Sequence, residues 1–101
     1  MAMTVVITRD VAQRFRGFLS SCMLEIAPGV YTAPRMSKAV RARVHTVIND
    51  WYHALAETGS IVMTWHDSSA PGGQSITTWG LPATDIVTID GVHLARRHLK
   101  Q

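Results

Sequence analysis

The stretch from Thr4 to Tyr31 reads TVVITRDVAQRFRGFLSSCMLEIAPGVY and predicts a strand, a turn, an amphipathic helix and a second pair of strands. Residues 4–8 are all threonine, valine or isoleucine, whose β-branched side chains suit a pleated, packed surface. Asp10 stands where an N-cap accepts hydrogen bonds from the unpartnered N–H groups of a helix start. The apolar face of this helix follows three- and four-residue spacing through Val11, Phe15, Phe18, Leu19 and Cys22. The single cysteine is therefore expected to be a buried, inert thiol.

Downstream of this stretch, periodicity and turn residues predict one more helix and several strands. We expect strands at 23–26 and 30–32, the second ending at Pro34, which donates no ladder hydrogen bond. Ser37 is the expected N-cap of the longest helix, residues 38–57. Further strands are predicted at 60–65, 74–80, 86–89 and 92–94. The order of the first six elements predicts an α+β fold, a ferredoxin-like βαββαβ sandwich with extra C-terminal strands.

The length of 101 residues predicts one ferredoxin-like domain over residues 1–81, followed by a C-terminal extension over residues 82–101. Apolar residues on both faces of the strands indicate that the face without helices is covered, most simply by a second copy in a homodimer. One cysteine, no membrane-length apolar run and no signal-peptide pattern predict a cytoplasmic protein without a membrane partner. The formal charge of +3 is consistent with a polyanionic partner.

Basic residues gather around the two predicted helix starts. They are Arg9, Arg14 and Arg16 at the first start and Arg35, Lys38, Arg41 and Arg43 at the second. Because the two helices are neighbours in this fold, we expect both groups to lie side by side on one surface. Arginines without interleaved stacking aromatics suit contacts to duplex phosphates better than base reading. The alternative is an ordinary solvated face. We interpret Trp51 and Trp65 as core residues, and Trp79 as core or dimer contact.

A metal-dependent nuclease is the competing hypothesis. Asp10, near the end of the first strand, is the candidate catalytic residue and Mg²⁺ ligand, since carboxylates hold this ion in nucleases. Glu25 is a second candidate that we expect on the outer face of its strand. The sequence has five histidines but no zinc-type spacing, no phosphate-cradling glycine loop and no nucleophile motif. A DNA-binding scaffold requires no cofactor, whereas a nuclease would use Mg²⁺.

Several motifs occur together along the chain: Arg14-x-Arg16-Gly17, Leu24-Glu25, Pro28-Gly29-Val30-Tyr31, Ser37-Lys38, Thr78-Trp79-Gly80-Leu81 and Ile89-Asp90-Gly91. This combination resembles the type I-E branch of the CRISPR-associated protein 2 family, over the chain up to Leu94. The resemblance implies a ferredoxin-like homodimer that acts in spacer acquisition. Such a dimer bridges dimers of the CRISPR-associated protein 1 integrase and supports double-stranded DNA.

The same resemblance implies roles for individual residues. Arg14, Arg16 and Lys38 would hold duplex phosphates, with Arg35 and Arg41 beside them. The C-terminal stretch would dock on the integrase or on the dimer mate by strand pairing, through Ile86, Val87, Ile89, Val92 and Leu94.

Two positions depart from the family pattern. The family is often described as a metal-dependent endonuclease of RNA or double-stranded DNA. Relatives with that activity carry an acidic residue where this chain has Arg9, and Asp10, one place later, is expected to point to the other side of the strand. Some relatives also carry paired arginines where this chain has residues 82–84, Pro-Ala-Thr. The prediction therefore leans toward a non-catalytic scaffold, with a nuclease as the alternative.

Overall fold

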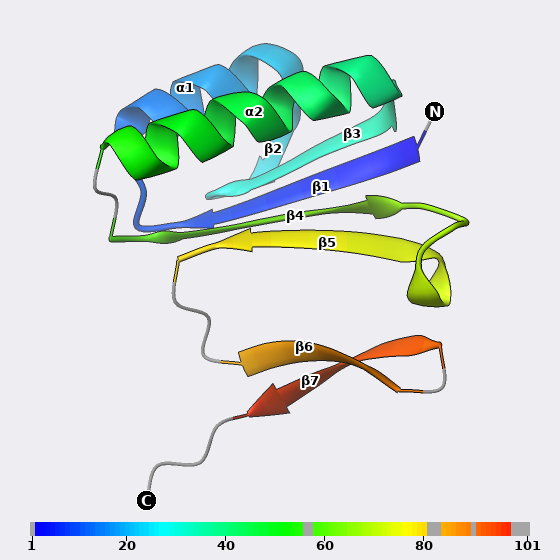
Figure 1. Cartoon of the computed structure of the whole chain (residues 1–101). Helices are drawn as coiled ribbons and strands as arrows, with labels where there is room; N and C mark the ends of the chain where they lie inside the picture. Colours follow the sequence, from blue (N-terminus) through cyan, green and yellow to red (C-terminus); the bar gives the residue numbers. More distant parts are fainter. Residues whose placement is uncertain (1, 56–57, 81–83, 90, 98–101) are drawn as a thin grey trace, which may run out of the picture.

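The computed structural model of the chain describes residues 2–55, 58–80, 84–89 and 91–97, with 84–89 and 95–97 described by their backbone alone. The elements are β1 (Ala2–Arg9), α1 (Gln13–Cys22), β2 (Leu24–Ala27), β3 (Val30–Met36), α2 (Lys38–Ala54), β4 (Ser60–His66), the 3-10 helix η1 (Pro71–Gly73), β5 (Gln74–Trp79), β6 (Thr84–Ile89) and β7 (Val92–Arg97). Both α-helices lie on the same face of the main sheet (Figure 1). In this described part, no helix is long and apolar enough to cross a membrane.

The main sheet has five strands in the order β2-β3-β1-β4-β5, and every neighbouring pair is antiparallel. The first four of these strands have the order of a ferredoxin-like sheet, and β5 extends it beyond β4. The predicted α+β, ferredoxin-like fold class is therefore confirmed. Because β1 and β3 are antiparallel neighbours, the helices that follow them start at opposite ends of the helix layer (Figure 1).

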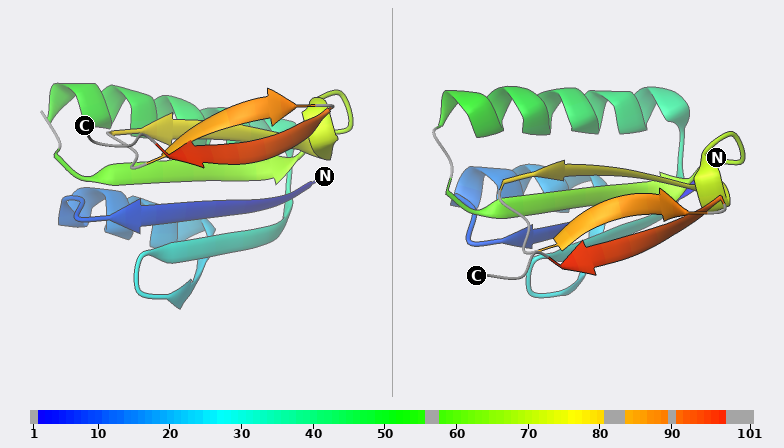
Figure 2. Two further views of the ribbon diagram at one scale, coloured as in Figure 1. Left: turned by 90° about the horizontal axis from the view of Figure 1, so that it is seen from below. Right: turned by 60° about the horizontal axis from the view of Figure 1, so that its bottom comes forward.

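The last two strands, β6 and β7, form a separate antiparallel hairpin. Seen from below, the hairpin lies in front of β4 and β5, on the side of the sheet that carries no helix (Figure 2). His93 ties it to the main sheet, because its Nε2 lies 2.6 Å from the carbonyl oxygen of Gln74. A hairpin alone is marginally stable in water, so these strands depend on such contacts.

The core lies between the sheet and the helices. Thr4, Val6 and Thr8 of β1 are buried on the helix side, whereas Met3 and Ile7 face the other way and are exposed, as the two-residue period of a strand requires. The helices contribute Phe15, Leu19, Val44 and Ile48, which are completely or almost completely buried, and the sheet contributes Tyr31, Ile61 and Met63. Each of the buried Val, Leu, Ile, Phe and Met side chains stabilises the fold by about 1.5–3 kcal/mol relative to exposure.

Two predictions about α1 are wrong. Its N-cap residue is Ala12, which makes no side-chain capping hydrogen bond. Asp10 instead has φ 60°, a left-handed conformation that turns the chain before the helix begins. Aspartate tolerates this conformation better than most residues do. Cys22 is exposed rather than buried, because α1 ends there and the next residue, Met23, enters the core.

The predictions for β3 and α2 agree better with the structure than those for α1. Ser37 caps α2 as predicted, accepting a hydrogen bond from the Val40 N–H at 3.2 Å. However, β3 does not end at Pro34 but continues to Met36. The ladder between β1 and β3 is irregular at this point, and a bulge accommodates proline because no ladder hydrogen bond is required there. In the predicted helix 38–57, residues 56–57 lie outside the described part.

Candidate nucleic-acid interface

The first basic group lies at the start of α1. Arg14 is exposed, and its guanidinium carbon lies 4.9 Å from the centre of the Trp51 ring on α2. Arg16, half-buried, donates from Nη2 to Glu25 Oε2 on β2 at 3.3 Å. The pKa of Arg16 is raised above its ordinary value by the nearby Tyr31 hydroxyl and then by the Glu25 carboxylate. Each of the two arginines is therefore held in place by a contact with another element.

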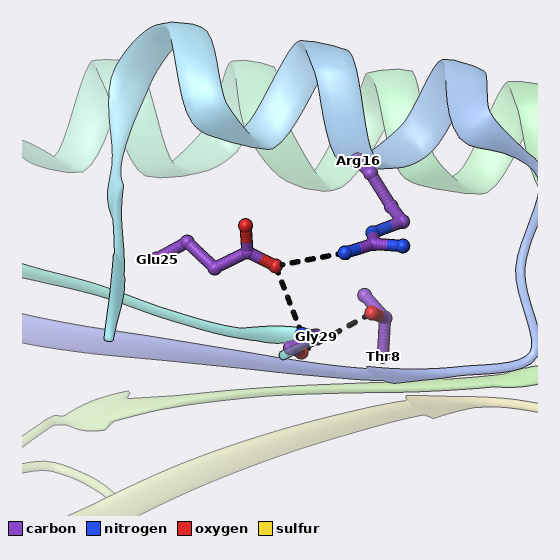
Figure 3. Close-up of polar contacts among 4 residues, drawn as sticks. All are labelled: Thr8, Arg16, Glu25 and Gly29. Carbon is purple, nitrogen blue, oxygen red and sulfur yellow. Dashed lines mark hydrogen bonds and ion pairs between the residues drawn. The ribbon is translucent and has the colours of Figure 1, made fainter. Parts of the chain in front are cut away.

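A clamped turn positions the Arg16–Glu25 pair (Figure 3). The Thr8 N–H and hydroxyl both donate to the carbonyl oxygen of Gly29, at 2.7 and 3.1 Å. The Gly29 N–H donates in turn to Glu25 Oε2 at 2.9 Å, and this bond is the main reason that the pKa of Glu25 is lowered. Gly29 has φ 76°, and a Cβ there would lie 2.6 Å from the Thr8 carbonyl oxygen. The turn thus requires glycine.

Tyr31 contributes a buried hydroxyl close to this network. It acts on the pKa of both Arg16 and Glu25. Even so, no atom of the described part meets the Tyr31 hydroxyl in hydrogen-bonding geometry. Tyr31 is therefore a polar neighbour of the ion pair and not a hydrogen-bonded partner.

Asp10, the predicted catalytic residue and metal ligand, is exposed at the end of β1. It borders a hollow of about 310 Å³ together with Thr8, Val11, Arg16, Pro28 and Gly29. Mg²⁺ requires several oxygen ligands in octahedral geometry, whereas this hollow also contains a guanidinium, and Glu25 is already bound by Arg16 and Gly29. Over residues 2–55, 58–80, 84–89 and 91–97, no group of three His, Cys, Asp or Glu gathers. The residues of one chain at this hollow do not fit a magnesium site.

The second basic group lies at the start of α2. Lys38 and Arg41 border a hollow of about 380 Å³ with residues of the β4–β5 loop, and Arg35 is exposed at the end of β3. Arg41 donates from Nη1 to the Met36 carbonyl oxygen at 3.3 Å, and its guanidinium carbon lies 5.1 Å from the centre of the Trp65 ring.

Asp67 is the carboxylate of this second hollow. It accepts hydrogen bonds from the Ser69 hydroxyl and N–H, at 2.6 and 3.0 Å, and from the Ser75 hydroxyl at 3.0 Å. The Ser69 hydroxyl is the first cause of its lowered pKa, and Arg41 adds a smaller contribution. Asp67 therefore remains ionised within a positively charged hollow.

The two basic groups do not lie side by side, contrary to our expectation. Arg14 stands against Trp51 near the end of α2, whereas Lys38 is the first residue of that helix. These positions are 13 residues apart (51 − 38) on α2, or roughly 20 Å along a helix axis. Arg9 also leaves the first group, because its neighbour Thr8 faces the helices and alternation places Arg9 on the opposite face. One helix layer thus has a basic group at each end.

The helix-free face of the sheet is apolar. Met3, Ile7, Leu24 and Ile26 are 44–66% exposed there, with half-buried Val5, Val30, Val62 and Ile76 between them. On the hairpin, Val92 and Leu94 are 52% and 48% exposed. The remaining predicted partner contacts, Ile86, Val87 and Ile89, belong to β6, and their side chains lie outside the described part.

Sequence reasoning missed the aromatic partners of the arginines. It interpreted Trp51 and Trp65 as core, and Trp79 as core or dimer contact. Trp79 belongs to the core, being 7% exposed with its indole N–H donating to Asn49 at 3.2 Å. Trp51 and Trp65 are only partly buried and carry an arginine each. No local pattern links Arg14 to a residue 37 positions away (51 − 14). Glu25 is exposed, as expected for an outward-facing residue, but it lies on the side of β2 that faces α1.

Residues 3–94 match the protein family described as CRISPR-associated protein (Cas_Cas2CT1978). The match covers nearly the whole chain, so the chain belongs to this family of CRISPR-associated, Cas2-like proteins.

Proposed function

We propose that this member of a CRISPR-associated family is a cytoplasmic DNA-binding scaffold of the type I-E branch, which holds duplex DNA by its phosphates during spacer acquisition. The observation that carries the proposal is the pair of basic groups at the two ends of the helix layer. Arg14, Arg35 and Lys38 are exposed, and Arg16 and Arg41 are half-buried. Arginine and lysine form strong, charge-assisted hydrogen bonds to phosphate.

The separation of the two groups suits a duplex that runs along the helices. A distance of roughly 20 Å along α2 corresponds to about six base-pair steps of B-form DNA. A duplex in this position contacts both groups without any base being read, because phosphate contacts carry no sequence information. The scaffold role requires no metal or other cofactor.

A second copy of the chain is the proposed cover of the helix-free face. Monomers seldom expose a large contiguous apolar patch, yet four large side chains of β1 and β2 are 44–66% exposed on this face. Homodimerisation would bury them and place two helix layers, each with two basic groups, in one particle. Analytical ultracentrifugation is expected to show a dimer, and Ile7→Glu is expected to shift it toward the monomer.

The β6–β7 hairpin is the proposed docking element for the CRISPR-associated integrase. It is a separate sheet with exposed Val92 and Leu94, and a strand edge of this kind accepts a partner strand. Removal of residues 82–101 is expected to abolish copurification with the integrase while the remaining domain still binds duplex. Unchanged copurification would contradict this assignment.

The DNA-binding proposal is tested by the salt dependence of affinity. Each phosphate contact contributes about −0.9 to the slope of log K against log salt. The double change Arg14→Ala with Arg16→Ala is expected to weaken duplex binding at least tenfold and reduce the slope by about 1.8. Arg9→Ala is the control, because it removes one arginine charge at the same end but on the opposite face. An unchanged slope in the double variant, or no duplex binding by the unmodified protein, would refute the proposal.

A further inference from the structure

Each helix of the proposed DNA-binding layer places an arginine against a tryptophan. The Arg14 guanidinium carbon lies 4.9 Å from the centre of the Trp51 ring, and that of Arg41 lies 5.1 Å from the centre of the Trp65 ring. Both distances are within the range of cation–π attraction. In each case the partners come from different elements, α1 with α2 and α2 with β4.

The Trp51 ring is itself held in one orientation. Phe15 and Phe18 meet it edge-on, with ring centres at 5.8 and 5.5 Å. Phe15 is completely buried, so this edge of the ring belongs to the core. The ring carries Arg14, which is exposed. Trp51 is thus a rigid platform between the core and the exposed side chain of Arg14.

A guanidinium on an aromatic face keeps its N–H groups free. The stack uses the face of the planar group, whereas hydrogen bonds to phosphate use its edge. Among the described residues, no hydrogen bond or ion pair of the Arg14 side chain is found, so within this part of the chain its N–H donors meet no competing acceptor. Holding the side chain before DNA arrives lowers the ordering cost that binding otherwise includes.

We propose that Trp51 and Trp65 are positioning residues for phosphate binding: each indole holds one guanidinium in a fixed orientation for a duplex phosphate. This inference rests on the proposed function and adds residues that themselves touch no DNA. Arg41 is also held by the Met36 carbonyl oxygen, whereas in the described residues the contact found for the Arg14 side chain is with the Trp51 ring. The Arg14–Trp51 pair is therefore the more sensitive test.

A double-mutant cycle separates positioning from folding. Duplex affinity is measured by fluorescence anisotropy for the unmodified protein, Trp51→Leu, Arg14→Ala and the double variant, all at a temperature where each is folded. Trp51→Leu is expected to weaken binding about fivefold, the ratio that corresponds to about 1 kcal/mol of cation–π stabilisation. In the Arg14→Ala background, the same change is expected to have no further effect. Equal weakening in both backgrounds would mean that Trp51 acts only through the fold, and would overturn the inference.

A conservative exchange covers the case in which Trp51→Leu does not fold. Arg14→Lys retains the charge at an exposed position but cannot stack as a planar group. It is expected to bind about fivefold more weakly with an unchanged salt slope, whereas Arg14→Ala also loses about 0.9 of the slope. If Arg14→Lys binds as tightly as the unmodified protein, the positioning role is wrong even though Arg14→Ala still weakens binding. If Arg14→Ala has no effect, the proposed function itself fails at this residue.

Discussion

The two ends of the helix layer contain the same kinds of residues but are held together by different contacts. We call the end where α1 starts the α1 end, and the end where α2 starts the α2 end. Each has an arginine on a tryptophan and a carboxylate with a lowered pKa, Glu25 at one end and Asp67 at the other. At the α2 end the organisation is local, since the carboxylate is bound by serines two and eight residues away and Ser37 caps the helix. At the α1 end it depends on residues distant in sequence.

The α1 end is held mainly by backbone contacts between separate segments. Thr8 binds the carbonyl of Gly29, 21 residues later, and a side chain at Gly59 would overlap the backbone carbonyls of Arg9 and Asp10. The N-cap residue of α1, Ala12, makes no side-chain capping hydrogen bond of its own. We infer that changes in packing damage the α1 end most, and that changes in local capping damage the α2 end most.

The largest effect is expected from Gly59→Ala. The added methyl group would overlap backbone at the end of β1, which cannot move aside as a flexible side chain can. We expect a loss of about 3 kcal/mol in the free energy of unfolding, at the upper end of overpacking costs. Urea denaturation measures this loss. Gly17→Ala is the control, because nothing lies within 4 Å of its added Cβ, and it should instead stabilise α1 by about 1 kcal/mol.

The next prediction compares how much each end of the helix layer contributes to duplex affinity. Arg35→Ala with Lys38→Ala removes two exposed charges at the α2 end. We expect a loss in duplex affinity and a reduction of about 1.8 in the salt slope, equal to that of the Arg14 and Arg16 pair at the other end. Titrations from low to moderate salt measure both values. A large loss for one pair and none for the other would mean that the duplex contacts a single end.

A smaller effect is expected from Ser37→Ala, which removes the cap of α2. The Val40 N–H loses its acceptor at 3.2 Å, and the cost of such a loss is about 1 kcal/mol. For a domain of this size, that corresponds to a fall of about 4–8 °C in Tm. Calorimetry measures the shift. Ser20→Ala, on the exposed side of α1, is the control and should leave Tm nearly unchanged.

The smallest effect is the pH dependence of stability. The folded-state pKa of Glu25 is lowered mainly by the Gly29 N–H, and that of Asp67 mainly by the Ser69 hydroxyl. A carboxylate with a lowered pKa stabilises the fold above its unfolded-state pKa, about 4, and this stabilisation is lost as the pH falls through the folded-state value.

Glu25→Gln and Asp67→Asn should therefore each flatten the loss of stability between about pH 5 and pH 3, relative to the unmodified protein. Urea midpoints measured across this range provide the comparison. A pH dependence that is identical in all three proteins would show that neither carboxylate contributes, and that the two ends do not share this feature.

Prediction from the sequence succeeded where the deciding interactions are local. Ser37 was identified as a cap because its acceptor lies three residues from the donor that it binds. Strand and helix faces followed from periods of two and 3.6 residues. Prediction failed at Asp10 because the cap assignment ignored the left-handed turn that the chain makes before α1. It failed at Pro34 because a bulge involves the partner strand as well.

The opposite placement of the two basic groups follows from the topology and could have been predicted from the sequence. An antiparallel ferredoxin-like order already implies that helices following neighbouring strands start at opposite ends. The contact between Arg14 and Trp51 could not have been predicted from the sequence, because their sequence separation carries no periodic signal. Neither could the pairing of Arg16 with Glu25, which depends on β2 passing beneath α1.

The sequence by itself determined the element types, the buried faces, the α2 cap and the basic character of both helix starts, because each depends on neighbours within about one turn or one strand. Only the tertiary structure decided that the basic groups stand at opposite ends of one layer and that two arginines rest on tryptophans. These features arise from segments that meet across the fold, and packing of the whole chain sets which segments meet.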